Sequence, residues 1–440
     1  MATDRYIAAL EISSSKVIGA VGAVGKSGQL EILAVEQEKS TDSVRYGHVQ
    51  NIEETSALIN FVLERLERRS NIAPREITGV YVGISGRSLR SIEKEVSLSL
   101  PDDTQITDTI IDRLKRKALE ADVDNSLEIV DAVPRIFTIG RTETHRPIGM
   151  MGSHISAIYD LIVARPAMQN NLKRVVADKL GLDIKGIVIT QLAMADVVLN
   201  EHEKKLGCLL VDIGSETASV SIYRHGNLLY YATLPMGGRN ITLDLKALNM
   251  IEDKAEELKV AFGNAIAPNI RSQEMIGPYK LSTISDYVVA RAEEIAANIV
   301  EQVRYAGLSE KDIPEGIVVC GGGARLNGMI DLIGKFSGVK VRMATFPGFI
   351  RMSDSNGQGI ECLQIAAIMY EGSKHSVDDC LQIPAAPQPE DNTADEGEVM
   401  PEPQPEKPKK KKKSFWDTFG TKIGQIFTPI GEDDEGDELS

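Results

Sequence analysis

Residues 208–234 read CLLVDIGSETASVSIYRHGNLLYYATL: an apolar strand, a tight turn and two further strand-length runs. Residues 6–33, YIAALEISSSKVIGAVGAVGKSGQLEIL, repeat that arrangement in the first half of the chain. When the two stretches are aligned, Glu11 falls opposite Asp212. The repetition predicts two related domains that face each other. A chance likeness between two short β-meanders is the alternative that the repeat alone leaves open.

Short strand-like runs and helix-length periodic stretches alternate across residues 1–372, which is typical of an α/β protein. The expected strands are Tyr6–Ile12, Val17–Val24, Gly79–Ile84, Ile184–Ile189, Leu209–Ile213, Ser219–Tyr223 and Ile317–Cys320. The expected helices are Thr55–Arg68, Thr107–Ala121, Met168–Leu180 and Ile284–Ala306.

The composition is that of a globular protein with a sizeable core. Of 440 residues, 42% are hydrophobic and 26% are charged. The net charge of −15 argues against binding of the whole molecule to nucleic acid. Four cysteines without zinc or disulfide spacing favour buried thiols in a reducing compartment. Because no signal-peptide pattern and no membrane-length apolar run occur, we expect a cytoplasmic location.

The turn after the strand Leu209–Ile213 is the first candidate binding element. Asp212 stands at the strand end, where a carboxylate can hold a metal ion or its water. Gly214 lets backbone N–H groups approach an anion, and the hydroxyls of Ser215 and Thr217 add donors for phosphate. Turns favour these residue types in any case, so this element alone is a weak indication.

Three more elements carry related chemistry. The matching turn, residues 11–16, offers three serine hydroxyls and Lys16 for phosphate. Residues 318–324, VVCGGGA, run a strand into three glycines, against which a phosphate or flat ring can lie. Glu256 and Lys259 fall on one face of a helix, where an ordinary surface ion pair is the simpler alternative.

In this order and spacing, the four elements resemble the actin/Hsp70/sugar-kinase superfamily, over about residues 5–372. Within it, five further stretches are similar to the FtsA family of bacterial cell-division proteins. They are HRPIGMMG (145–152), GIVITQLAMADVVLNEHEKKLG (186–207), LPMGGRNITLDL (234–245), EELKVAFGNA (256–265) and YVVARAEEIAANIV (287–300). The resemblance implies an actin-like two-lobed ATPase fold of the α/β class, with a small α+β subdomain inserted.

The domain boundaries that we expect follow from the same resemblance and from composition. They are lobe 1 (1–85, 166–198 and a return helix at 363–372), the inserted subdomain (86–165), lobe 2 (199–362, with a nucleotide-side and partner-binding subdomain at about 241–315), a disordered linker (373–408), a membrane-targeting helix (409–427) and an acidic tail (428–440).

The resemblance also implies ATP and Mg²⁺ as cofactors, without direct protein ligands to the metal. It assigns Glu11 and Asp212 to positioning of the Mg²⁺ ion or its water. The phosphate contacts are Ser13, Ser14, Ser15, Lys16, Gly214, Ser215 and Thr217; the ribose and adenine side takes Glu256 and Lys259; adenosine lies against Gly321, Gly322, Gly323 and Ala324; Gly238 is a further cofactor-binding residue.

The first turn departs from the family's usual Asp-Ile-Gly-Thr, since it reads Glu11-Ile12-Ser13-Ser14. Glutamate is one methylene longer than aspartate, which would shift a magnesium-bound water. Ser13 replaces a glycine and keeps the backbone farther from phosphate. Phosphoryl transfer depends on positioning. We therefore expect ATP binding with weak or absent ATPase activity.

The C-terminal region changes character. Residues 374–408 contain seven prolines and nine acidic residues, a composition that predicts a disordered linker. An apolar stripe at helical spacing follows a lysine cluster, which predicts an interfacial helix on an anionic membrane. The cluster is Lys409, Lys410, Lys411, Lys412 and Lys413, and the stripe is Phe415, Phe419, Ile423, Ile426 and Phe427, widened by Trp416. A docking helix or a nuclear-type basic signal is the alternative.

The resemblance implies a protein that anchors FtsZ filaments to the inner face of the cell membrane and helps to assemble the division septum. The partners implied are the FtsZ C-terminal peptide, bound at Arg291 and Glu294, other copies of the chain in an actin-like polymer, further division proteins and an anionic membrane surface, with no nucleic acid. The alternatives are a superfamily kinase or phosphatase, or a PilM-like assembly ATPase. An Hsp70-like chaperone would need a β-rich peptide-binding domain after residue 372.

Overall fold

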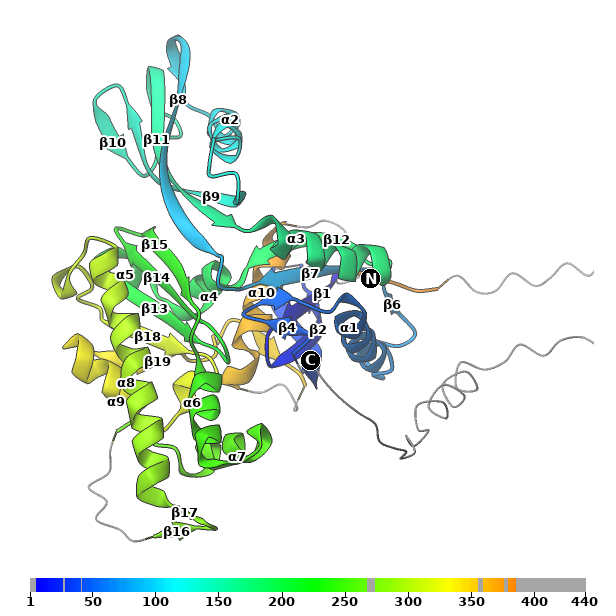
Figure 1. Cartoon of the computed structure of the whole chain (residues 1–440). Helices are drawn as coiled ribbons and strands as arrows, with labels where there is room; N and C mark the ends of the chain where they lie inside the picture. Colours follow the sequence, from blue (N-terminus) through cyan, green and yellow to red (C-terminus); the bar gives the residue numbers. More distant parts are fainter. Residues whose placement is uncertain are drawn as a thin grey trace, which may run out of the picture. The chain divides into compact units, whose positions relative to one another are not determined.

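The computed structural model describes residues 5–26, 28–40, 42–266, 274–354, 359–375 and 379–384 (Figure 1). Most of the expected linker, the basic amphipathic segment at 409–427 and the acidic tail lie outside the described residues. No helix in the described part of the chain is long and apolar enough to cross a membrane.

Lobe 1 is built on a six-stranded sheet with the order β12-β7-β1-β2-β3-β20. The strands are β1 (Arg5–Ile12), β2 (Lys16–Val24), β3 (Leu30–Lys39), β7 (Gly79–Ile84), β12 (Asp183–Ile189) and β20 (Arg351–Met352). β1, β2 and β3 form an antiparallel meander, and β7 lies parallel to β1. The first of the two sequence hairpins is therefore the centre of this sheet.

Helices cover both faces of the lobe 1 sheet. α1 (Ile52–Glu67) packs on β2 and β3, and α10 (Leu363–His375) packs on β1, β2, β7 and α4 (Thr190–Val198). Gly19 and Gly22 allow this close packing, because a Cβ at Gly19 would lie 2.7 Å from Val62 of α1 and one at Gly22 would lie 2.7 Å from Met369 of α10.

Lobe 2 and the inserted subdomain share a nine-stranded sheet with the order β10-β9-β11-β8-β15-β14-β13-β18-β19. The strands of lobe 2 are β13 (Cys208–Ile213), β14 (Ala218–Arg224), β15 (Asn227–Leu234), β18 (Ile317–Cys320) and β19 (Val341–Met343). Its helices are α6 (Gly238–Leu245), α7 (Glu252–Phe262), α8 (Leu281–Tyr305) and α9 (Met329–Ser337). The second sequence hairpin is β13–β14, the counterpart of β1–β2.

The inserted subdomain has a core of its own. α2 (Asp108–Leu119) packs on β8 (Arg90–Gln105), β9 (Glu128–Ile139) and β11 (Met151–Ala164), and β10 (Thr142–Thr144) pairs with β9 (Figure 1). Its sheet joins that of lobe 2 at one residue pair, Ala232 with Arg90. Short elements complete the fold: β4 (Val44–Arg45), β5 (His48–Val49), β6 (Glu76–Ile77), α3 (Pro166–Lys173), a π-helix (Arg174–Lys179), α5 (Glu201–Leu206), β16 (Met275–Ile276), β17 (Tyr279–Lys280) and β21 (Leu381–Gln382).

The predicted α/β, actin-like fold with an inserted subdomain is confirmed, and each expected strand and helix occurs close to its expected bounds. The expected start of the linker at residue 373 is wrong. α10 continues to His375, Cys380 is buried, and Leu381 pairs with Ile77 in a small antiparallel sheet. This strand could not be predicted from composition, because it is very short and acidic and proline residues surround it.

Candidate functional site

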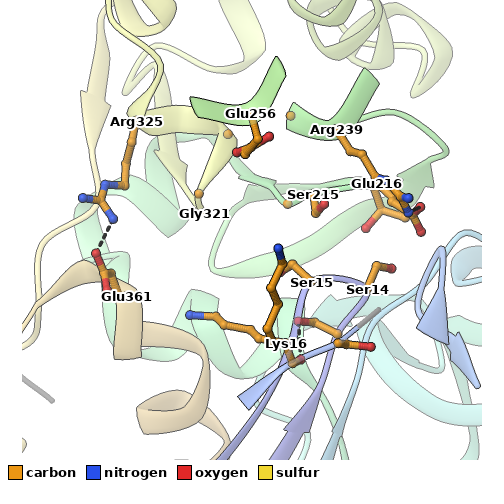
Figure 2. Close-up of a pocket in the computed structure, with 18 of the residues that line it drawn as sticks. Ser14, Ser15, Lys16, Ser215, Glu216, Arg239, Glu256, Gly321, Arg325 and Glu361 are labelled. Atoms are coloured by element: carbon orange, nitrogen blue, oxygen red, sulfur yellow. Dashed lines mark hydrogen bonds and ion pairs between the residues drawn. The ribbon is translucent and has the colours of Figure 1, made fainter. Parts of the chain in front are cut away.

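A cavity of about 1190 Å³ lies between the turns that follow β1 and β13. Ser14, Ser15 and Lys16 line its lobe 1 side, and Ser215, Glu256 and Gly321 line its lobe 2 side (Figure 2). The residues that the sequence assigned to phosphate, ribose and adenosine thus lie around one space, with the exception of Ala324. The lining members are Ser13, Ser14, Ser15, Lys16, Gly214, Ser215, Thr217, Gly238, Glu256, Lys259, Gly321, Gly322 and Gly323.

The first turn is held by its own side chains. The Ser13 backbone N–H and hydroxyl both donate to the carbonyl of Lys16, at 3.0 and 2.8 Å, which closes the β1–β2 hairpin. The Ser14 hydroxyl accepts from the Gly47 N–H at 3.1 Å. The Ser15 hydroxyl forms no hydrogen bond to any other described residue, so this donor remains available to an anion in the cavity.

The second turn is packed against the start of α6. Gly214 donates to the Thr217 carbonyl at 2.8 Å, and its own carbonyl accepts from the Gly238 N–H at 2.9 Å. A Cβ at Gly237 would lie 2.5 Å from the Gly214 carbonyl oxygen, so only glycine permits this approach. The helix N-terminus therefore lies directly beside the turn, where its dipole favours negative charge.

Lys259 on α7 has three hydrogen-bond partners, two of them on α6. Its Nζ lies 3.1 Å from the Gly238 carbonyl, 3.0 Å from the Thr242 hydroxyl and 2.7 Å from the Glu256 carboxylate. The pair is therefore more than a surface ion pair: it fastens α7 to the start of α6 at the wall of the cavity. Glu256 is half-exposed, with its carboxylate directed toward the space (Figure 2).

The glycine turn after β18 depends on glycine at Gly321. Its φ is +87°, and a Cβ there would lie 2.3 Å from Asp212 Oδ1. Ala324, which the resemblance assigned to adenosine, is not among the residues that line the cavity. It belongs to a short 3-10 turn, Gly323–Arg325, that turns its side chain into the buried core of lobe 2.

Glu11 and Asp212 are buried carboxylates at the ends of the two strands that lead into the turns. Burial raises the pKa of Glu11 to about 7, against an opposing effect of Lys16, and raises the pKa of Asp212 to about 6, against hydrogen bonds that include one from Gln364. Glu11 Oε2 and Asp212 Oδ1 are buried without a hydrogen-bond partner in the described structure. Burying unpaired carboxylate oxygens is unfavourable unless a ligand satisfies them.

These orphaned oxygens fit a hydrated Mg²⁺ ion, which prefers oxygen ligands and keeps several waters. Within the described ranges, no group of three or more His, Cys, Asp or Glu side chains could hold a metal. A magnesium ion at this place would therefore need phosphate oxygens and water to complete its shell.

Sequence reasoning missed the charged residues at one end of the cavity. Asp42, Glu216, Arg239 and Glu252 all line it and are joined by ion pairs. One signal was present: Glu216 lies inside the phosphate turn, where a carboxylate needs cationic partners. The partners themselves come from distant parts of the sequence and could not be identified from it.

Arg291 and Glu294 lie on α8, away from the cavity. Arg291 Nε is 2.6 Å and Nη2 is 3.1 Å from the carboxylate oxygens of Asp244 on α6, and the same guanidinium pairs with Glu294. Leu243 of α6 and Met275 of β16 are exposed apolar side chains in this part of lobe 2. The lysine and aromatic residues assigned to the membrane helix lie outside the described residues.

Comparisons with known proteins agree with this architecture. A family model described as "Cell division protein FtsA" matches residues 209–354, and one described as "SHS2 domain inserted in FTSA" matches residues 86–163. The cell division protein FtsA of Porphyromonas gingivalis is 29% identical over 77% of this chain and 73% of that protein. The FtsA protein of Pseudomonas aeruginosa is 27% identical over 85% of this chain and 91% of that protein.

Among solved structures, the PilM–PilN type IV pilus biogenesis complex contains a chain of the same fold, with a TM-score of 0.61 and 15% identity, over 83% of this chain and 98% of that chain. The two family models together take in about half of the chain, and the FtsA relatives extend over most of it. The chain belongs to the FtsA family of cell-division proteins and has an actin-like fold.

Proposed function

We propose that this chain binds Mg-ATP between its two lobes and anchors FtsZ filaments to the cytoplasmic membrane at the division septum. One observation carries the nucleotide part: two duplicated hairpins bring their turns, and two buried unsatisfied carboxylates, to a single cavity. Membership of the FtsA family supports the cell-division part.

Different lining residues would contact the phosphates, the ribose and the adenosine of ATP. The hydroxyls of Ser15 and Ser215, together with Lys16, face the phosphates from opposite lobes, and the N-terminus of α6 adds a favourable dipole. Glu256 can accept from a ribose hydroxyl, while the glycines at 321–323 leave room for the adenosine. When bound, Mg²⁺ supplies charge neutralisation for the phosphates.

Slow hydrolysis fits the same geometry. The longer Glu11 side chain shifts the oxygen that would position a water, and phosphoryl transfer depends on that positioning. We therefore propose that ATP stays bound for a long time without being hydrolysed. Slow turnover suits a structural adaptor better than a metabolic kinase.

The surface that joins α6 and α8 is our candidate for the FtsZ C-terminal peptide. Arg291 and Asp244 form a fixed ion pair there, next to the exposed Leu243. Fixed charges beside apolar side chains can orient a short peptide that carries both kinds of group. The membrane contact rests on the sequence of residues 409–427, and assembly with other copies of the chain rests on the family.

Co-sedimentation of the full chain with vesicles that contain anionic phospholipid tests this function. We expect the wild-type protein to carry FtsZ into the pellet. Trp416→Glu should leave both proteins in the supernatant, because a charge is forced into the acyl boundary. Arg291→Glu should pellet alone, without FtsZ. Wild-type protein that pellets without FtsZ would contradict the anchoring role.

A further inference from the structure

The buried carboxylate of Glu216 joins the two lobes at one end of the cavity. Its side chain is only 3% exposed, although it belongs to a turn that lines an open space. Three donors satisfy it: Arg45 Nε at 2.7 Å, the Tyr46 backbone N–H at 2.6 Å and Arg239 Nη1 at 2.8 Å. Two of these come from lobe 1 and one from lobe 2.

Arg239 extends the connection back across the cavity. Its Nη1 also lies 3.0 Å from Asp42 of lobe 1, and its Nε lies 2.6 Å from Glu252 of α7. The guanidinium of Arg45 reaches Asp42 at 3.2 Å. The two cations and three carboxylates therefore form a continuous network that alternates in sign and crosses from one lobe to the other.

The lobe 1 part of this network also contacts the first phosphate turn. The Gly47 N–H donates to the Ser14 hydroxyl, while the neighbouring Tyr46 N–H donates to Glu216 in the second turn. Tyr46 and Gly47 have φ angles of +50° and +76°, and a Cβ at Gly47 would lie 1.9 Å from the Ser85 carbonyl oxygen. This backbone conformation directs two successive N–H groups to different phosphate turns.

The opposite end of the cavity has a much weaker cross-lobe contact. There Arg325 of lobe 2 pairs with Glu361, which lies between β20 and α10 of lobe 1, and the side chains are 57% and 53% exposed (Figure 2). Exposed ion pairs contribute little because solvent screens them, whereas a buried carboxylate that loses a partner is left with an unfavourable unpaired charge. Among the ion pairs that join the lobes at the two ends of this cavity, the Glu216 network is therefore the one whose loss is more unfavourable, and the hydrogen bond from Gln364 to Asp212 also joins the lobes at the cavity.

We infer that residues Asp42–Gly47 together with Glu216 and Arg239 form a clasp that holds the lobes closed over the nucleotide and limits its release. Glu216 and Arg45 are positioning residues, which act on the nucleotide through the two phosphate turns. This inference rests on the proposed nucleotide site and specifies how that site is regulated.

Two variants separate a clasp from a general change in the cleft's electrostatic potential. Arg45→Gln removes a positive charge and Glu216→Gln removes a negative one, so a change in electrostatic potential would move the release rate of ATP in opposite directions in the two variants. Loss of the clasp would raise the release rate in both. We expect each variant to release a fluorescent ATP analogue about tenfold faster than the wild type, with association rates changed by less than about twofold.

The double variant and matched controls complete the experiment. In the double variant, Arg45→Gln with Glu216→Gln, the fold-increase in the release rate should be smaller than the product of the two single fold-increases, because both substitutions break the same contact. Glu301→Gln and Arg304→Gln break an exposed pair on α8 outside the cavity and should match the wild type. Arg45→Lys keeps the charge and one donor, so its release rate should fall between those of the wild type and Arg45→Gln.

Several outcomes would overturn the clasp. Release rates that move in opposite directions, or that equal the wild-type rate, contradict it while leaving the nucleotide site intact. Wild-type protein that does not bind the analogue contradicts the nucleotide site and the clasp together. If a variant does not fold, amide exchange of the wild type decides: the Tyr46 and Gly47 N–H groups should exchange at least about tenfold more slowly with ATP bound, and equal exchange contradicts the clasp.

Discussion

The turns after β1 and β13 follow one plan but are held in different ways. In the first turn, the Ser13 side chain closes the hairpin and Glu11 lies near Lys16. In the second turn, Gly214 packs against the start of α6, and Asp212 accepts a hydrogen bond from Gln364. The two hairpins are thus similar frames, and the residues that differ in the first one alter the position of the charge rather than the fold.

The largest effect that we expect from this difference is on stability against pH. The folded-state pKa of Glu11 is about 7, above its ordinary value of 4.5, so the folded protein retains a proton that the unfolded chain has lost. The Glu11 contribution to stability without nucleotide should therefore fall by about 2 kcal/mol as pH rises from 5 to 8. Asp212, with a pKa of about 6, contributes in the same direction at lower pH. Burial lowers the pKa of His48, so this residue acts in the opposite direction.

Urea unfolding at both pH values measures this effect. Glu11→Gln should remove most of the Glu11 share, since an amide does not titrate, while Glu301→Gln at an exposed helix position should leave the pH dependence unchanged. The same pH dependence in the wild type and in Glu11→Gln would contradict the raised pKa of the buried Glu11 carboxyl.

A second prediction makes the two turns more alike. Glu11→Asp restores the length of the counterpart Asp212, and we expect ATP turnover to rise by about tenfold, because displacements of about 1 Å can change rates up to about a hundredfold. Asp212→Glu makes the opposite change and should lower turnover further. Equal turnover in wild type and Glu11→Asp, with equal ATP affinity, would show that the side-chain length is not what limits hydrolysis.

The smallest expected effect concerns Ser13. Ser13→Gly makes the first turn resemble the second and removes the hydroxyl that bonds to the Lys16 carbonyl. We expect a loss of about 1 kcal/mol in the free energy of unfolding, with ATP affinity unchanged or slightly higher. Thermal unfolding and an ATP titration check the two parts separately. A more stable variant would mean that the hydroxyl is not a net contributor to the turn.

Much of this site could be predicted from the sequence because its signals are local. Each phosphate turn directly follows an apolar strand, and the glycines at 321–323 follow β18 in the same way. The sequence therefore predicts that these residues lie at the ends of strands. The inserted subdomain also has its own strand and helix pattern. Patterns of this kind can be recognised in the sequence because all their residues are close together along the chain.

The features that sequence did not reveal depend on long-range contacts. Glu216 meets Arg45 across 171 positions, and Gln364 meets Asp212 across 152. The inward direction of Ala324 depends on a single 3-10 turn, and the β21 strand depends on its pairing with β6. None of these has a periodicity or a motif, because their partners are set only by the folded chain.

Every other property proposed for the site depends on the binding of Mg-ATP in the cavity between the two turns. Isothermal titration of the full wild-type chain with ATP, with and without Mg²⁺, tests it most directly, with Asp212→Ala as the variant and Glu301→Gln as the control. We predict saturable binding that Mg²⁺ strengthens, with that strengthening lost in Asp212→Ala and kept in Glu301→Gln. Failure of the wild-type protein to bind ATP at concentrations of about 1 mM, which corresponds to about −4 kcal/mol, would contradict the account.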